Sequence, residues 1–239
     1  MEYLFEVLIL TLIAGLAIPL GGLVSRYLKF NNHWLEAEVN HFIIAFGGGA
    51  LLSAVALVLV PKGTESLTIL PAMLCFGSGG VCFMLLDRYL ASKGTSMSQL
   101  VAMLTDFVPE ALALGAMFCV SRESGLLLAL IIFLQNLPEG YNAFKELHKS
   151  EVHNGKRVLL AFVAMAFLGP LSGSVGLLVL VDYVEVLAGI MLFASGGIIY
   201  TIFEDIAPMA RLKYHWAPPL GAVFGFMFGM VGEMLVHGG

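Results

Sequence analysis

The chain has 239 residues, of which 59% are apolar and only 12% are charged, with a formal net charge of −5. This balance excludes an ordinary soluble domain, because most of the surface has to face lipid. A helix needs roughly 20 mainly apolar residues to cross a bilayer core, so the length accommodates about eight spans. We therefore predict a single all-α integral membrane domain over residues 1–239, with the lipid bilayer as a partner and no nucleic-acid partner.

Clusters of polar residues divide the chain into apolar runs. The first run follows Met1-Glu2-Tyr3 without a basic n-region and is too long for a signal-peptide core, so we expect it to be retained. In chain order, the predicted spans are 4–25, 40–60, 67–86, 98–120, 124–144, 158–181, 184–209 and 217–237.

The basic residues predict an orientation. Those in the connections after the odd-numbered spans are Arg26, Lys29, Arg88, Lys93, Lys145, Lys149, Lys156, Arg157, Arg211 and Lys213. The opposite side has only Lys62 and Arg122. The positive-inside rule then places the first side in the cytoplasm. We expect a multi-pass protein of the cell (inner) membrane with both termini outside.

The fourth predicted span, 98–120, carries the run Thr105-Asp106-Phe107-Val108-Pro109-Glu110. Asp106 and Glu110 are four residues apart and therefore share one helix face. Pro109 lacks an N–H and clashes with the carbonyl four residues before it, which predicts a kink and a freed carbonyl at Thr105. At membrane depth, such backbone is tolerated only where it is packed in protein or lines a cavity.

The fifth span, 124–144, repeats the pattern as Leu134-Gln135-Asn136-Leu137-Pro138-Glu139-Gly140. No Lys or Arg lies within the predicted spans, and an ionised carboxylate at this depth costs several kcal/mol. A divalent metal cation is the simplest counter-charge, because carboxylate and amide oxygens from two helices form a hard-donor shell. The acids could instead be protonated and hydrogen-bonded to one another.

These two motifs resemble the ZIP (Zrt/Irt-like) family of divalent metal transporters, especially its GufA-like prokaryotic branch, whose fourth and fifth helices read His-Asn-x-Pro-Glu-Gly. Residues 46–61 are similar to the family's small-residue second helix, and residues 195–208 to its seventh. The resemblance implies eight transmembrane helices, with inverted three-helix repeats flanking central kinked helices four and five. It also implies alternating access to a site at the bilayer midplane.

The resemblance assigns the metal residues by position. Asp106 and Gln135 stand where the family usually has histidines, whereas Glu110, Asn136 and Glu139 match its motifs. Glu204 and Asp205 correspond to a pair at the inner exit. The predicted metal residues are Asp106, Glu110, Gln135, Asn136, Glu139, Glu204 and Asp205.

Two departures from the family bear on the number and kind of metal ions. Phe107 replaces an asparagine and Gly169 replaces the sixth-helix glutamate, so we expect one metal site. All six histidines lie in loops or at span ends, including His153. An all-oxygen shell favours manganese, iron(II) or magnesium, while the family resemblance keeps zinc in the set. No organic cofactor is expected.

The predicted function is uptake of a divalent metal cation, the protein's substrate, across the cytoplasmic membrane. A non-transporting metal sensor or regulatory membrane subunit is the alternative. An intramembrane hydrolase is less favoured, since the sequence has no HExxH motif, and we expect that the protein is not an enzyme. Carrier or channel behaviour, the coupling ion and a homodimeric state stay open.

Overall fold

The computed structural model describes residues 3–28, 31–93, 97–149, 155–213 and 215–237. Lys29 and His153, which the sequence analysis used, lie outside these residues, and the side chains of Lys93 and Lys149 are not described. Every regular element in the described residues is helical. The longer elements are α1 (Leu4–Tyr27), α2 (His33–Ser53), α4 (Ile69–Lys93), α5 (Met97–Val120), α6 (Arg122–Lys149), α7 (Gly155–Ala166), α8 (Leu168–Leu178), α9 (Val184–Thr201) and α11 (Leu220–His237).

Short elements extend two of these helices. A π-helical turn, η1 (Ala54–Leu59), joins α2 to α3 (Val60–Glu65), and a second one, η3 (Ile202–Ile206), joins α9 to α10 (Ala207–Ala210). A short 3-10 turn, η2 (Leu180–Asp182), follows α8.

Six stretches among the described residues are long and apolar enough to cross a membrane, which makes the chain a multi-pass membrane protein. They are Leu4–Tyr27, His33–Glu65, Ile69–Ser92, Met103–Val120, Gly155–Asp182 and Val184–Ala210. The helix α6 is not among them, since polar residues interrupt its apolar run, and α11 is apolar but shorter. The all-helical membrane fold is thus confirmed, while the count of eight spans stays a prediction.

The observed helix boundaries differ from the predicted spans for local reasons. The helix α2 begins at His33 rather than at residue 40, because the Asn32 side chain accepts a hydrogen bond of 2.9 Å from the Trp34 N–H and caps it. The predicted span 158–181 is divided at Phe167 into α7 and α8. Pro170 explains the break, since its ring would clash with the carbonyl of Ala166 in a continuous helix.

The two π-helical turns were not predicted from the sequence. Each ends two residues before a proline, Pro61 after η1 and Pro208 after η3. In contrast, α5 and α6 stay α-helical through Pro109 and Pro138. Since π turns are frequent at functional sites, their position next to the predicted exit residues is informative.

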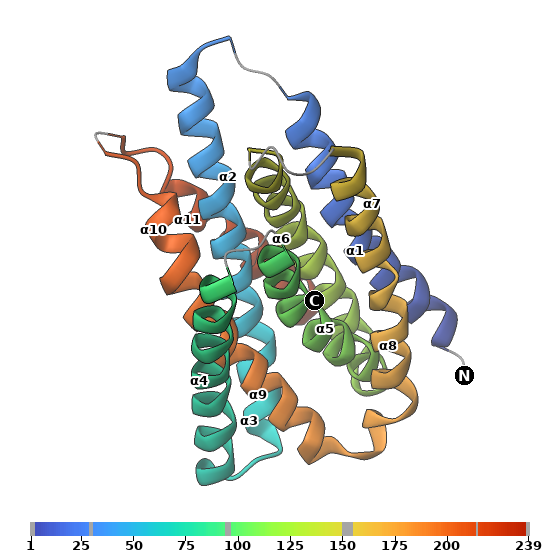
Figure 1. Cartoon of the computed structure of the whole chain (residues 1–239). Coiled ribbons are helices and arrows are strands. Elements are labelled where there is room, and N and C mark those ends of the chain that lie inside the picture. The colour runs from blue at the N-terminus through green and yellow to red at the C-terminus, as the bar shows by residue number, and fades with distance from the viewer. Residues whose placement is uncertain (1–2, 29–30, 94–96, 150–154, 214, 238–239) are drawn as a thin grey trace.

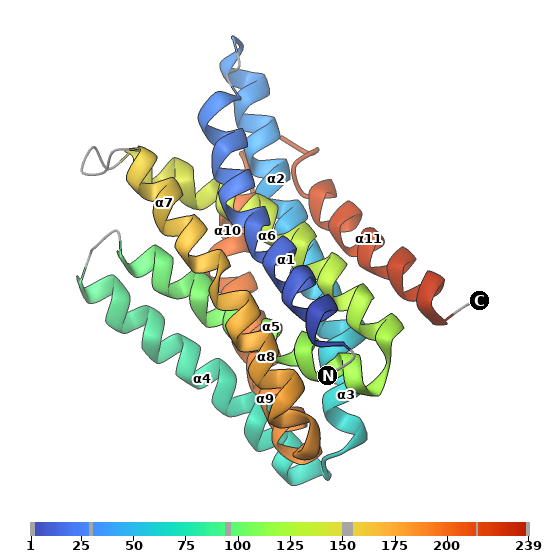
Figure 2. The ribbon, with the colours of Figure 1, turned by 90° about the vertical axis from the view of Figure 1, so that its right-hand side faces the viewer.

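The helices pack as two bundles (Figures 1 and 2). In the α5–α6 bundle, α1 packs on α6, α7 and α8, and α5 packs on α6 and α8. In the α2–α9 bundle, α2 packs on α11, and α9 packs on α3 and α4. The bundles meet mainly where α2 contacts α6 and where α5 contacts α9.

Glycine allows the closest of these approaches. A Cβ atom added to Gly140 would lie 2.1 Å from the carbonyl oxygen of Ile18, so α1 and α6 touch backbone to backbone at this position. Small residues permit such contacts between helices in lipid. Gly140 directly follows Glu139, and this contact therefore fixes α6 beside the predicted site.

The connections lie at two ends of the molecule. The α10–α11 connection lies at the end where α1 finishes and α2 starts, and the α3–α4 and α8–α9 connections lie at the other end (Figures 1 and 2). We call these the Arg211 end and the Glu65 end. The first turn of α1 and the last turn of α11 both point toward the Glu65 end. The described chain thus starts and finishes on the same side.

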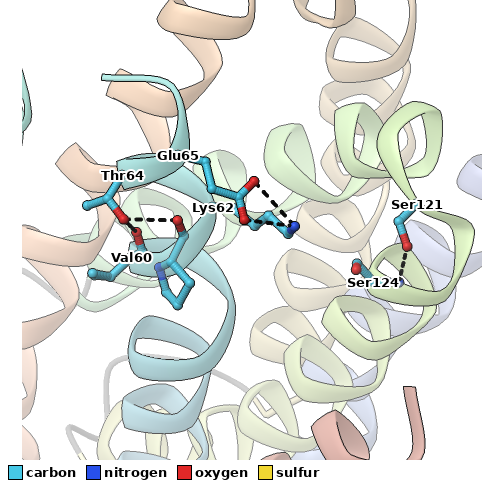
Figure 3. Close-up of polar contacts among 7 residues, drawn as sticks. Val60, Lys62, Thr64, Glu65, Ser121 and Ser124 are labelled. Atoms are coloured by element: carbon cyan, nitrogen blue, oxygen red, sulfur yellow. Dashed lines mark hydrogen bonds and ion pairs between the residues drawn. The ribbon is translucent and has the colours of Figure 1, made fainter. Parts of the chain in front are cut away.

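The two basic residues predicted on the Glu65 side are both paired with acids. Lys62 Nζ lies 3.1 Å from Glu65 Oε1, in a turn where the Thr64 hydroxyl donates to the Val60 carbonyl (Figure 3). Arg122 Nε donates a hydrogen bond of 2.9 Å to Glu6 Oε2 and ties α6 to α1. Their positive charges are therefore balanced locally.

Candidate metal-binding site

A cavity of about 150 Å³ lies where the two bundles meet, between α2, α5, α6 and the stretch from η3 to α10. Four acids are among its described lining residues: Asp106, Glu139, Glu146 and Asp205. These lining residues include no Lys, Arg or His. A cavity of this kind attracts cations and repels anions.

One face of α6 and a small-residue face of α2 shape the cavity. Gln135, Glu139, Asn142 and Glu146 are spaced by four, three and four residues, so they follow one side of α6. Opposite them, α2 presents Gly47 and Gly48, which carry no side chain into the space. The sequence therefore lines one wall with oxygen atoms and the other with glycines and the apolar side chains of Ile44 and Leu51.

A polar cluster lies at the deep end of the cavity, and some of its hydrogen-bond acceptors have no donor. The Gln135 side-chain N–H group donates to both carboxylate oxygens of Glu110, at 2.5 Å each. Glu110 is fully buried, and Asp106 and Gln135 are 6% and 2% exposed. Gln135 Oε1 and Asp106 Oδ1 have no hydrogen-bond partner.

These two oxygens are the most informative atoms of the site. Leaving a buried acceptor without a partner costs about 1–3 kcal/mol, and more for a charged group. Burial against a neighbouring acid adds to this cost, since Asp106 also experiences repulsion from Asp205. A cation bound by these oxygens would remove both penalties.

Five of the seven predicted metal residues line the cavity or lie behind it. Asp106, Gln135, Glu139 and Asp205 line the cavity. Glu110 lies behind it and is held by Gln135.

Asn136 and Glu204 do not line the cavity. The Asn136 side chain instead donates a hydrogen bond of 2.9 Å to the Ala14 carbonyl on α1, and Glu204 is exposed.

Two lining residues, Asn142 and Glu146, were missed by the sequence analysis. They lie three and seven residues after Glu139, so they share its face of α6. The predicted motif ended at Gly140 and the predicted span at residue 144, so Asn142 lay beyond the motif and Glu146 beyond the span. Asn142 Nδ2 lies 3.3 Å from Glu146 Oε1.

The acids line a wall and do not form a closed cage. Among the described residues, no three His, Cys, Asp or Glu side chains are grouped so as to hold a metal ion. A bound cation would therefore use amide oxygens and water beside the carboxylates, as hard divalent cations do.

Phe107 and Gly169, the two departures from the family pattern, lie against each other. A Cβ atom added to Gly169 would be 2.8 Å from Phe107 Cζ and 2.6 Å from the Thr11 carbonyl oxygen. The Phe107 ring is only 1% exposed. An aromatic ring thus fills the space beside the position where the resemblance would supply a further carboxylate.

Comparison of the chain with protein-family models and with curated proteins finds no match. The resemblance to ZIP transporters therefore rests on the motifs themselves.

The cavity extends toward one end of the molecule only. On the Glu65 side of Glu110, buried apolar side chains pack together: Val55, Val58, Leu59, Leu114, Met117, Phe118, Leu127, Leu128, Ile131 and Ile132. On the Arg211 side, the cavity reaches Glu146 and Asp205, which are exposed. Ions from the Arg211 side therefore have the shorter path to Asp106.

The different positions of Asp205 and Glu204 lead to a testable difference. Asp205→Ala removes a charge from the cavity wall, so the metal uptake predicted from the sequence should slow by about tenfold, whereas Glu204→Ala should change it by less than about twofold. Initial rates of uptake into proteoliposomes measure both. Equal losses in the two variants would contradict this assignment of the cavity wall.

Proposed function

We propose that this chain transports a divalent metal cation across the membrane through the cavity between its two bundles, as a carrier similar to the ZIP family. The observation that supports this most directly is the pair of buried, unpartnered oxygens, Asp106 Oδ1 and Gln135 Oε1, in a cavity lined by acids. Metal ions that give up water need such oxygen ligands and compensating negative charge.

The residues present suit a hard cation. Asp106 and Glu139 supply charge, the Gln135 amide supplies a neutral oxygen, and Asp205 with Glu146 extends the acidic wall toward the Arg211 end. Glu110 adds negative charge directly behind Gln135. One ion is proposed, since Phe107 and Gly169 leave no ligand for a second.

Alternating access is supported by the way the helices pair. The contact of α1 with α6 has a counterpart in that of α8 with α5, and the contact of α2 with α11 has one in that of α9 with α4. The π turns η1 and η3 follow the same correspondence. We infer inverted repeats of three helices around α5 and α6, with eight spans in total.

The direction of motion follows from where the cavity opens. The apolar cluster that includes Leu114 and Leu128 separates the cavity from the Glu65 end. Sliding or rocking of the α5–α6 bundle against the α2–α9 bundle would open that side and close the Arg211 side. We assign the Arg211 end to the cytoplasm of an inner-membrane protein and both termini to the outside.

The experiment that tests the function is uptake of radioactive manganese, iron(II) or zinc into proteoliposomes that contain the purified protein. Uptake that saturates and depends on the protein supports transport. Metal-dependent thermal stabilisation without uptake would instead favour a metal sensor or regulatory subunit, a candidate favoured by the absence of a three-acid cage among the described residues. If the protein showed no uptake and no metal-dependent stabilisation, both the transporter and the sensor proposals would be overturned.

The oxygen ligands predict a metal preference. Manganese or iron(II) should compete with radioactive zinc at least as well as unlabelled zinc does, because no imidazole or thiolate lines the described cavity. Asp106→His should shift the preference toward zinc by about tenfold. Competition curves for wild type and variant, measured side by side, decide this. Zinc-exclusive uptake by the wild type would refute the oxygen-shell argument.

The proposed orientation is testable with single cysteines. In a variant whose native Cys75, Cys82 and Cys119 are replaced by serine, a membrane-impermeant maleimide added to intact cells should label Glu123→Cys and not Arg157→Cys. Labelling after cell lysis is the control for reactivity. The reverse pattern would invert the topology.

A further inference from the structure

A second and larger cavity, of about 1000 Å³, adjoins the first one. It is a groove between α2, the stretch from η3 to α10, and the start of α11. Gly48 and Ile206 line both cavities, and a Cβ atom on Gly48 would lie 2.6 Å from Ile206 Cγ2. The contact of Gly48 on α2 with Ile206 on η3 therefore lies between the groove and the metal-binding cavity.

The wall of the groove is apolar along α2. Ala45, Gly49 and Leu52 line it from this helix, and Ile202 and Ala222 line it from the facing elements. Ala45 and Leu52 are seven residues apart, which corresponds to a rise of roughly 10 Å along the helix. An acyl chain can lie against a surface of this length.

One end of the groove is basic. Arg211, Lys213 and His215 line it there, and no Asp or Glu is among its described lining residues. The nearby Glu38 carboxylate contacts His215 Nδ1, and the His215 ring stacks on Trp34 at 5.6 Å. The groove and the metal-binding cavity therefore differ in the sign of their charge.

Trp216 lines the same end and is 90% exposed. Tryptophan is enriched at the level of the lipid headgroups. Its position next to Arg211 and Lys213 indicates that this end of the groove lies at the membrane–water boundary. From there the apolar wall runs toward the bilayer core.

From this arrangement we propose that the groove binds an anionic glycerophospholipid. Arg211 and Lys213 hold the headgroup phosphate, and one acyl chain lies along Gly49, Leu52 and Ala222. Basic pockets between transmembrane helices bind anionic headgroups, and a metal cation would be repelled here. This binding does not depend on whether the protein transports metal.

The test is lipid titration of the purified full-length protein in a neutral detergent, followed by thermal unfolding. Phosphatidylglycerol should stabilise at a concentration about thirtyfold lower than phosphatidylcholine with the same acyl chains, because the two basic residues favour the anionic headgroup. Inorganic phosphate should not stabilise. Equal effects of the two lipids, or an equal effect of free phosphate, would overturn the proposal.

Matched variants assign the effect to the groove. Arg211→Gln with Lys213→Gln should abolish the preference for phosphatidylglycerol and keep the response to phosphatidylcholine. Arg26→Gln with Arg157→Gln makes the same charge change outside the groove and should keep the preference. A preference that survives the first pair, or is lost with the second, contradicts the site.

The apolar part is tested separately. Ala207 is exposed and lines the groove, so Ala207→Trp should weaken binding of both lipids by at least about tenfold. Ala164→Trp, on an exposed face of α7, is the control and should leave binding unchanged. Unchanged binding in Ala207→Trp would also overturn the proposal.

Discussion

Replacement of Glu139 by alanine should abolish metal uptake, with an initial rate at least about a hundredfold below that of wild type. Glu139 combines a carboxylate with a place on the wall of the cavity, beside Gln135 and across from Gly47 and Gly48. Removing it takes away charge that compensates the cation for its lost water. Uptake of radioactive metal into proteoliposomes measures the effect.

Charge can be separated from packing by a conservative change. Glu139→Gln keeps the shape of the side chain and removes its charge, so it should be nearly as inactive as Glu139→Ala. Glu185→Ala, which removes an exposed acid at the start of α9, is the control and should be active. An active Glu139→Gln variant would show that the charge is not required and would overturn the proposed site.

Folding should survive the loss of Glu139. An acid without a basic partner in the membrane opposes insertion, so its removal eases insertion if it has any effect. Metal-dependent thermal stabilisation should disappear in the same variant. Loss of uptake with normal expression and unchanged thermal stability without metal is therefore the expected combination.

Replacement of Glu110 should impair metal uptake as strongly as replacement of Glu139, for a different reason. It does not line the cavity, but both of its carboxylate oxygens accept the Gln135 N–H group, which fixes the amide with its oxygen unpartnered. Without Glu110, the Gln135 amide is free to rotate. This contact gives Gln135 a second role beside its neutral oxygen, because Gln135→Ala would leave the buried Glu110 carboxylate without this donor.

The sequence predicts the helical membrane fold and the face that carries the acids, because both depend on local patterns. Asp106 and Glu110, or Gln135 and Glu139, are four residues apart and follow one side of a helix whatever the tertiary structure. Residues that are adjacent in a motif do not share a helix face. Consecutive residues of a helix point about 100° apart, so Gln135 and Asn136 do not face the same cavity.

The same difference in direction separates the two predicted exit residues. Glu204 and Asp205 are neighbours, and only Asp205 lines the cavity. The π turn that includes both residues precedes Pro208, but α5 and α6 stay α-helical through their own prolines, so a proline alone does not predict such a turn. Helix ends were also misplaced, since the caps at residues such as Asn32 lie outside the apolar runs that defined the spans.

Gly140, the last residue of the second Pro-Glu motif, should tolerate no side chain at all. Gly140→Ala would place a Cβ atom 2.1 Å from the carbonyl oxygen of Ile18. Neither backbone can yield easily, because the neighbouring Gly21 makes a reciprocal contact with the Leu137 carbonyl. We expect the free energy of unfolding to fall by about 3 kcal/mol or more, with loss of uptake as a consequence.

The matched control is Gly77→Ala. Gly77 also lies within a long apolar helix, α4, but an added Cβ atom there meets nothing within 4 Å. Alanine is the better helix former, so this variant should be neutral or more stable by up to about 1 kcal/mol. Thermal unfolding of both variants in the same detergent makes the comparison. If Gly140→Ala unfolded like Gly77→Ala, the close contact of α1 with α6, and with it the position of Glu139 in the cavity, would be wrong.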